Sequence, residues 1–114
     1  MFAVIFEVKP ISEGKEEYLK IAAELRTFLK DRAGFISIER FQSLNDDGKI
    51  LSLSFWESEE SIAEWRNIIQ HRTAQKKGKP SLFHSYRIRV AKITRDYSES
   101  DRTEAPLDSR KTLG

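Results

Sequence analysis

The sequence predicts a single α+β domain with the ferredoxin-like element order β-α-β-β-α-β. Four segments alternate apolar and polar residues, two segments repeat apolar residues at helical spacing, and Gly, Pro or short polar runs separate them. At 114 residues the chain suffices for one domain with a small core. We therefore expect a four-stranded antiparallel sheet with both helices on one face, within residues 1–96. Residues 97–114 form a polar tail, either flexible or in contact with a partner.

The first half of the chain predicts a strand, a helix and a second strand. Residues 2–9 alternate in apolar character until Pro10 interrupts them. Residues 15–32 gather their apolar side chains on one helical face, and Gly34 suits the left-handed conformation that follows many helices. Residues 35–43 alternate again and complete this half.

The second half predicts a hairpin turn, a strand, a helix and a last strand. Residues 45–48, Asn-Asp-Asp-Gly, favour a tight turn because Asn and the Asp-Gly step readily adopt positive φ. Ser58 suits the N-cap of a helix that runs to about residue 77, and residues 82–96 form the last strand. The strand over residues 49–56 is expected to face the core with Leu51, Leu53 and Phe55.

The sheet face opposite the helices also carries apolar residues in this prediction. They alternate with the expected core residues and are Ile5, Ile36, Ile38, Ile50 and Trp56. Monomers rarely leave an apolar patch of that size in water, and a second sheet stacked on it would cover it. We therefore expect a homodimer, with a lone domain bearing scattered apolar surface residues as the alternative.

Composition and charge narrow the classes of partner. The net charge is +2, from 20 Lys and Arg against 18 Asp and Glu, which does not indicate nucleic-acid binding. A local excess of cations around Arg72 to Arg95 fits a solvated helix end or a rim that attracts an anionic ligand. The chain has no Cys, no apolar run long enough to span a bilayer and no basic leader before its apolar start. We expect a cytoplasmic protein without nucleic-acid or membrane partners.

Aromatic and titratable residues gather in the second half of the chain. Arg72 lies seven residues after Trp65 and shares its helical face, whereas His71 lies about 240° around the helix from Trp65. His84 and Tyr86 are two residues apart on one strand and so share a face. Arg87 and Arg89 occupy the opposite face, where we expect them to pair with Glu39 or Glu7. A metal site using both histidines and a carboxylate would need a fixed spacing that the sequence lacks, so none is expected.

A set of motifs resembles the antibiotic biosynthesis monooxygenase domain family. The resemblance spans about residues 2–95, and the residues that carry it are Phe55-Trp56-Glu57-Ser58, Trp65, His71-Arg72, Ala74-Gln75, Gly78 and Tyr86. It implies a dimeric α+β barrel. It also implies that Trp65 faces a cleft between helices and sheet and stacks on an aromatic ligand; the alternative is a core tryptophan.

The resemblance implies a small oxygenase that acts on an electron-rich aromatic such as a quinol, without a bound metal or flavin. In that scheme the protein removes a phenolic proton and the resulting anion passes an electron to O2. The proton would go to His71, His84 or Tyr86. Arg72 would hold the oxyanion, and the pocket walls would be Trp65, Phe55 and Phe83.

Two other functions stay open at this level. The haem-degrading branch of the family pairs the helix tryptophan with a His ligand, whose position falls at Gln75, and with an Asn on the first strand, which has none. Haem is therefore disfavoured, although His71 or His84 is left as a substitute ligand. A non-catalytic module that binds a small aromatic or a protein partner in the same cleft is the second alternative, because a pocket needs no catalyst.

Overall fold

The computed structural model describes residues 1–74 and 83–109; for residues 68–74, 83 and 84 it describes the backbone only. The elements follow the predicted order, with one added 3-10 turn. They are β1 (Phe2–Pro10), η1 (Ser12–Gly14), α1 (Lys15–Leu29), β2 (Phe35–Gln42), β3 (Ile50–Trp56), α2 (Glu59–Ala74) and β4 (Phe83–Lys92). Among the described residues, no helix is long and apolar enough to cross a membrane.

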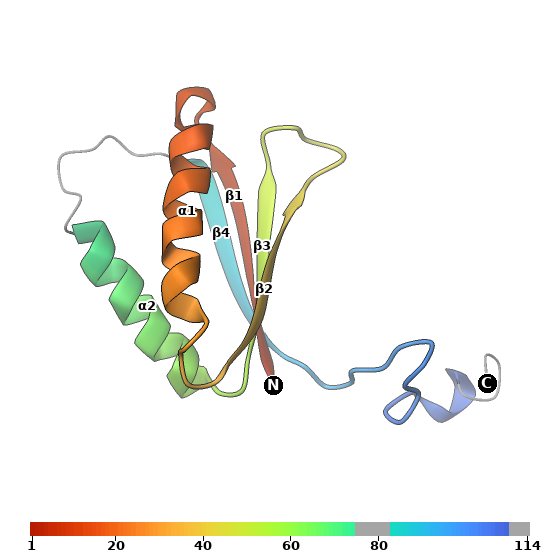
Figure 1. Cartoon of the computed structure of the whole chain (residues 1–114). Coiled ribbons are helices and arrows are strands. Elements are labelled where there is room, and N and C mark those ends of the chain that lie inside the picture. The colour runs from red at the N-terminus through yellow and green to blue at the C-terminus, as the bar shows by residue number, and fades with distance from the viewer. Residues whose placement is uncertain (75–82, 110–114) are drawn as a thin grey trace.

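The four strands form one sheet in the order β2-β3-β1-β4, and every neighbouring pair is antiparallel. Figure 1 shows the two helices in front of and beside this sheet. The predicted fold is therefore confirmed. Two elements are shorter than predicted: α1 ends at Leu29 instead of residue 32, and β4 ends at Lys92 instead of residue 96.

The main core lies between the sheet and the facing ends of the two helices. Leu29 of α1, Trp56 of β3 and both Ile62 and Trp65 of α2 form one buried cluster. The indole Nε1 of Trp56 donates a hydrogen bond to Ser54 Oγ at 2.9 Å, so its polar atom is satisfied within the core. A second cluster joins β1, α1 and β3 toward the other end of the sheet, through Val8, Tyr18 and Ile50.

The prediction for β3 assigned its two faces the wrong way round. Trp56 and Ile50 are 1% and 5% exposed and face the helices, so the alternation turns Leu51, Leu53 and Phe55 to the opposite side. Both rows of this strand contain large apolar residues, so alternation alone does not say which row faces the helices. In the structure the indole of Trp56 packs in one cluster with Leu29 of α1 and with Ile62 and Trp65 of α2.

We call the side of the sheet away from the helices the outer face. The pairing of the strands shows which residues of each strand point to this face. Ile5 lies there as predicted, whereas Ile38, Ile50 and Trp56 pack on the helix side instead. The outer face is formed by Ala3, Ile5, Glu7, Ser37, Glu39, Phe41, Leu51, Leu53, Phe55, Arg87, Arg89 and Ala91.

Gly34 lies in the connection between α1 and β2 and packs against the start of α2. It has φ of +82° as predicted, although it follows the helix by several residues and is not its immediate cap. The N–H of Glu57 donates to the Gly34 carbonyl at 2.8 Å, and an added Cβ at Gly34 would lie 2.6 Å from Ser61 Cβ. The predicted N-cap is confirmed, because Ser58 Oγ accepts the Ser61 N–H at 3.2 Å.

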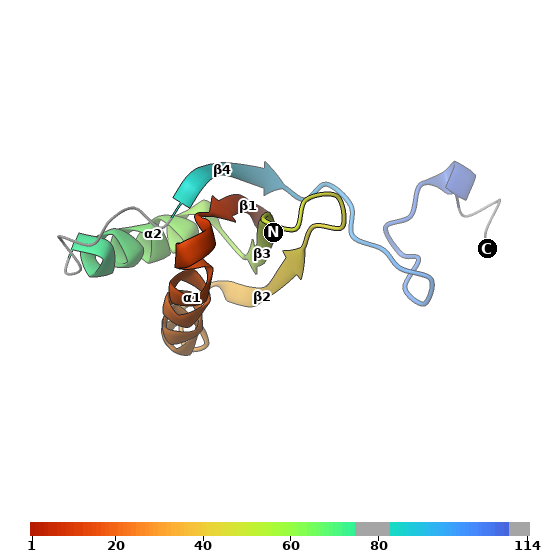
Figure 2. The ribbon, with the colours of Figure 1, turned by 90° about the horizontal axis from the view of Figure 1, so that it is seen from above.

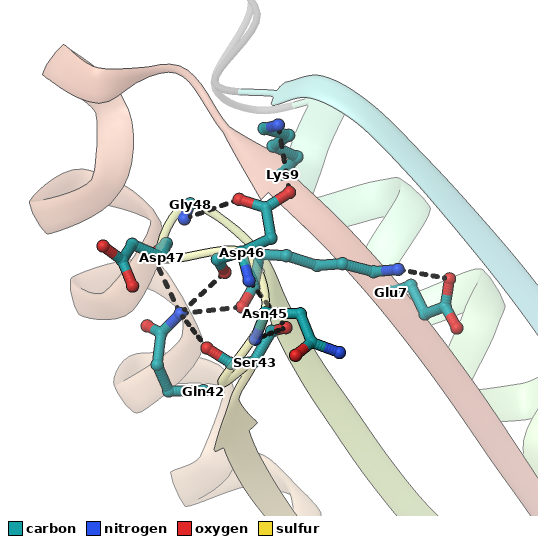
Figure 3. Close-up of polar contacts among 9 residues, drawn as sticks. Glu7, Lys9, Gln42, Ser43, Asn45, Asp46, Asp47 and Gly48 are labelled. Atoms are coloured by element: carbon teal, nitrogen blue, oxygen red, sulfur yellow. Dashed lines mark hydrogen bonds and ion pairs between the residues drawn. The ribbon is translucent and has the colours of Figure 1, made fainter.

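The β2–β3 turn lies where the sequence predicts it, but side chains stabilise it instead of a positive-φ Gly48. Figure 3 shows Gln42 beneath the turn, with its side-chain amide directed at the backbone carbonyls. Gln42 Nε2 donates to the carbonyls of Asp47 at 2.8 Å and Lys49 at 2.9 Å. Asp46 Oδ1 accepts the Gly48 N–H at 3.0 Å, which forms an Asx-type turn.

The C-terminal segment extends away from the sheet, as Figures 1 and 2 show. Its described part, residues 97–109, forms local turns: Thr103 Oγ1 donates to Asp101 Oδ1 at 2.8 Å, and Arg102 lies over the Tyr97 ring at 5.2 Å. The Thr103 hydroxyl and N–H lower the pKa of Asp101. Contact of this segment with a partner stays a prediction.

Candidate functional site

The helix side of β4 bears a strip of exposed apolar side chains. We call Tyr86, Ile88 and Val90 the β4 strip; register pairs them with Val8, Phe6 and Val4 of β1, which pack against the core. Their exposures are 63% for Tyr86, 55% for Ile88 and 46% for Val90. Exposure therefore rises toward the beginning of β4, on the sheet face where the helices lie.

The arrangement of the two helices accounts for this gradient. α1 and α2 lie close together where α1 ends and α2 begins, and they diverge toward the other end (Figure 1). The view from above shows α2 running out to one side of the sheet (Figure 2). Tyr86 lies near the start of β4 and is the most exposed residue of the strip. Apolar groups with one polar hydroxyl are the usual lining of a small-molecule site.

Tyr86 has a defined ring position on this strip. Its ring meets that of Phe6 edge to face, with centroids 6.0 Å apart and an interplanar angle of 63°. The ring is thus positioned while most of the side chain is open to solvent. A phenol in this position can donate or accept a hydrogen bond with a ligand lying on the strip.

Trp65 lies at the inner end of the same side of the sheet. It is 9% exposed and packs in the cluster with Leu29, Trp56 and Ile62. This environment matches the core alternative for Trp65. Stacking of Trp65 on a ligand stays a prediction, and its burial restricts such contact to an edge of the indole.

Phe55 does not share a site with Trp65. Trp56 lies in the same buried cluster as Trp65 on the helix side, and Phe55 is the residue before Trp56 on the strand, so it points to the outer face. The predicted pocket wall at Phe55 is therefore wrong for a helix-side site. The reversed faces of β3 are the cause.

Four predicted site residues have side chains outside the described part of the structure: His71, Arg72, Phe83 and His84. Their backbones place the first two near the end of α2 and the last two at the start of β4. The β1–β4 register shifts between Lys9 and Pro10, where these residues pair with Ser85 and Phe83. The shared face predicted for His84 and Tyr86 stays a prediction.

The predicted ion pair on the opposite face of β4 is confirmed. Arg89 Nη1 lies 3.3 Å from Glu7 Oε1, and Lys49 Nζ lies 3.3 Å from Glu7 Oε2. The hydrogen bond from Lys49, together with the charges of Lys49 and Arg89, lowers the pKa of Glu7. These charges belong to the outer face and not to the strip.

Ile88 and Val90 were not selected from the sequence. The signal that could have found them is their spacing of two from Tyr86, which places all three on one strand face. Sequence alternation alone does not indicate that the helices leave this face exposed.

Several hollows lie elsewhere on the surface. One of about 450 Å³ lies between α1 and β2, lined by Arg26, Lys30, Phe35 and Ile38 among others. Others of about 740 Å³ and 640 Å³ lie against the C-terminal segment and beside the β2–β3 turn. The linings of these three do not include Trp65, Tyr86 or Phe55. Within residues 1–74 and 83–109, no group of three His, Cys, Asp or Glu side chains could hold a metal ion.

Comparison with known proteins gives a family and two related sequences. Residues 1–77 match the family described as antibiotic biosynthesis monooxygenase. A jasmonate monooxygenase from Pyricularia oryzae is 45% identical over 94 residues, covering 82% of this chain and 44% of that protein. The chain thus spans less than half the length of that relative. The uncharacterised protein YqjZ from Bacillus subtilis is 35% identical over 95 residues, covering 82% of this chain and 80% of that protein.

Solved structures share the fold at low sequence identity. The cofactor-independent oxygenase SnoaB from Streptomyces nogalater has a TM-score of 0.65 at 11% identity, covering 83% of this chain and 94% of that one. The heme-degrader MhuD from Mycobacterium tuberculosis, with two hemes in its active site, has a TM-score of 0.64 at 15% identity, covering 86% and 100%. At these identities the likeness establishes the fold alone.

Proposed function

Because the chain belongs to the antibiotic biosynthesis monooxygenase family, we propose that it is a small monooxygenase that oxidises an electron-rich aromatic substrate without a bound metal or flavin. The observation that carries this proposal is the β4 strip. Tyr86, Ile88 and Val90 offer an apolar surface and one phenol on the helix side of the sheet. A flat phenolic substrate would lie on Ile88 and Val90 with its hydroxyl toward Tyr86.

The chemistry uses electrons from the substrate itself. Removal of the phenolic proton of a quinol, or of the acidic ring C–H proton of an anthrone, gives an anion that passes one electron to O2, and the two radicals combine into a peroxide at a ring carbon that carries hydrogen. Loss of water from the peroxide leaves a carbonyl at that carbon. One oxygen atom enters the product and the other leaves as water, so the substrate is oxidised and O2 is reduced without another reductant.

The protein would supply proton transfer and charge stabilisation. We assign the hydrogen bond to the phenolate to Tyr86, proton removal to His71 or His84, and stabilisation of the oxyanion to Arg72. Phe83 would form a wall at the start of β4. An anion in an apolar site is costly, so a cation close to its oxygen favours ionisation.

We also propose that two copies of the chain associate through the outer face. In the single chain, Phe41 is 42% exposed, and Ile5, Leu51, Leu53 and Phe55 are half-buried at the surface. Stacking two such faces would remove them from water and form an interface of sheet on sheet.

Oxygen uptake by the metal-free protein with a panel of quinols, anthrones and related phenols tests the proposed activity. We expect uptake above the autoxidation background, reduced at least tenfold by Ile88→Gln, because a polar side chain on the strip disfavours an apolar ligand. Ile36→Gln is the matched control, since Ile36 is a 46% exposed isoleucine of β2 at the opposite edge of the sheet. The proposal would be contradicted if no compound of the panel gave oxygen uptake above the autoxidation background. An equal loss of uptake in both variants would contradict it too.

A second substrate class follows from the relative in Pyricularia oryzae. Its name gives jasmonate as substrate, and it is 45% identical to this chain over 82% of the chain. Jasmonate carries a carboxylate and no phenol, so its oxidation would need an external electron source. Gain of one oxygen atom by jasmonic acid, seen by mass spectrometry with an added reductant, would favour this class over the phenols.

The residues present do not fit the haem site of the family. β1 has no Asn, Gln75 occupies the position of the ligand His, and Trp65 is packed in the core. We therefore derive no step through haem. A spectral titration with haem separates this alternative from a non-catalytic binding module, which would bind a small aromatic and raise its melting temperature without consuming O2.

A further inference from the structure

A groove between α1 and β2 lies at the edge of the sheet opposite to β4. Figure 2 shows α1 beside the beginning of β2, and these two elements form its walls. Its volume is about 450 Å³, which is in the usual range for a site that holds a small organic molecule. We call it the α1–β2 groove. The proposed oxygenase site does not include it.

Two cationic side chains line the groove from α1. Arg26 and Lys30 are four residues apart, so they lie on the same face of the helix. Both are exposed, and neither has an ion-pair partner within the part of the chain that the structure describes. No Asp or Glu is among the described residues that line the groove. Like charges at this spacing repel each other, and a bound anion would offset that repulsion.

The wall formed by β2 is apolar. Phe35 and Ile38 line the groove and also pack against the main core cluster, which fixes their positions. The ring of Phe35 meets that of Trp56 edge to face, with centroids 5.3 Å apart and an interplanar angle of 68°. Ala23 adds a small apolar contact from α1. The groove therefore suits a molecule with an apolar body and an anionic group.

An irregularity in β2 produces this apolar wall. The pairing of β2 with β3 shifts between Phe35 and Ser37. Strict alternation would turn Phe35 and Ile38 to opposite faces, whereas both pack on the helix side. Bulges of this kind are frequent beside functional sites, because they redirect side chains.

The side chains of α1 also indicate the kind of anion. Thr27 Oγ1 donates its hydrogen to the Glu24 carbonyl at 2.7 Å, so this hydroxyl is not available as a donor to a ligand. The charge of the ligand would therefore be matched by Arg26 and Lys30. The planar guanidinium of an arginine binds a carboxylate through two parallel hydrogen bonds, and an ammonium adds a second positive charge.

We propose that the α1–β2 groove is a second binding site, which takes a small aromatic carboxylate. The ring lies on Phe35 and Ile38, and Arg26 and Lys30 bind the carboxylate. The cations select an anion, and the ring of Phe35 favours a flat aromatic body. This site and the β4 strip lie at opposite edges of the sheet, so the inference does not depend on the proposed oxygenase.

Isothermal titration calorimetry with three compounds tests the recognition. The probe is 2-naphthoate; 2-naphthamide has the same rings without the charge, and acetate has the charge without the rings. We expect 2-naphthoate to bind at least about tenfold more tightly than either of the other two, because each lacks one half of the contacts. Absence of binding by 2-naphthoate, or equal affinity for the naphthamide, would overturn the proposal.

Substitution of the two cations tests which residues bind the carboxylate. Arg26→Gln and Lys30→Gln should each weaken 2-naphthoate binding about threefold, and the double variant R26Q/K30Q about tenfold. Arg32→Gln is the matched control, since Arg32 is an exposed cation just after α1 that does not line the groove. Equal affinities in R26Q/K30Q and R32Q would overturn the assignment.

Ala23 offers a second pair of variants that should keep the fold, because it is exposed on α1 and both Glu and Gln favour helices. Ala23→Glu places a carboxylate in the groove and should weaken 2-naphthoate binding at least about fivefold relative to Ala23→Gln, which has nearly the same size without the charge. Equal affinity in the two variants would contradict binding of the anion beside Ala23.

Backbone amide NMR signals locate the bound acid. Addition of 2-naphthoate should shift the signals of residues 23–30 and 35–38, which form the two walls. Shifts confined to residues 86–90 would place the acid on the β4 strip and overturn the proposal. These outcomes are separate from oxygen uptake, which tests the strip.

Discussion

Phe55 and Trp56 are consecutive residues of β3, yet their side chains serve opposite faces of the sheet. Trp56 is 1% exposed in the core with α1 and α2, whereas Phe55 lies on the outer face beside Ala3. The first side chain stabilises the single chain, and the second is available to a partner. Two neighbouring residues of β3 therefore have different roles, Trp56 in the fold of the single chain and Phe55 in the proposed dimer.

Alanine at these two positions should therefore have different effects on urea unfolding. Trp56→Ala removes a buried indole and is expected to lower the free energy of unfolding by about 3–5 kcal/mol at every protein concentration. Phe55→Ala should lower apparent stability mainly where the wild type is dimeric, so its effect depends on concentration. Equal, concentration-independent losses in both variants would contradict the assignment of faces.

Gly34 should tolerate substitution less than Gly48. Gly34→Ala forces a side chain into φ of +82° and against Ser61, so we expect a loss of about 2 kcal/mol or more in the free energy of unfolding. Gly48→Ala is the matched control, because its added Cβ would meet Lys9 at 3.4 Å without positive φ. Equal urea midpoints for the two variants would contradict the requirement for glycine at position 34.

Asp46 should contribute to the acid sensitivity of the fold. Its carboxylate accepts hydrogen bonds from Lys9 Nζ and the Gly48 N–H, both at 3.0 Å, and these lower its pKa below the ordinary 3.8. Its contribution is fully present above the unfolded pKa and disappears as the pH falls through the folded value. Asp46→Asn should therefore flatten the loss of stability on acidification below about pH 4.

Asp47→Asn is the control for this experiment, because it removes the same charge from the same turn without breaking the Lys9 contact. Thermal unfolding as a function of pH measures both variants. A slope on the acid side that Asp46→Asn leaves unchanged would show that the pair is not maintained in solution.

The C-terminal segment should affect assembly more than folding. Its described contacts are largely internal, apart from those of Arg95 and Asp96 with Glu104. A chain ending at residue 96 is expected to keep its circular dichroism spectrum and to dissociate as a dimer at higher concentration. Unchanged mass in light scattering across the concentration range would indicate that the segment does not contact the partner.

Local sequence signals predicted the order of elements and several contacts. Ser58 caps α2, Gly34 has positive φ and Arg89 pairs with Glu7, because each depends on neighbouring residues or on one strand pairing. The faces of β3 were not predictable in the same way. Both of its rows contain large apolar residues, and the choice depends on where α1 and α2 leave room for an indole.

In the candidate site, too, some features follow from local sequence and others depend on how the helices pack. Tyr86 was selected as a group able to take a phenolic proton, and the structure places its ring beside that of Phe6. The exposure of Ile88 and Val90 depends on the angle between two helices that are distant from β4 in sequence. No spacing of residues encodes that angle directly.

The measurement that tests the proposed monooxygenase most directly is incorporation of isotope-labelled O2 into product by the metal-free protein. With the quinol or anthrone that gives the largest oxygen uptake, mass spectrometry should find one labelled oxygen atom per product molecule. Tyr86→Phe should lower the rate, and Tyr97→Phe, the same change in the C-terminal segment, should not. Product without label, or label at the same rate without protein, would contradict the assignment of this chain as an oxygenase.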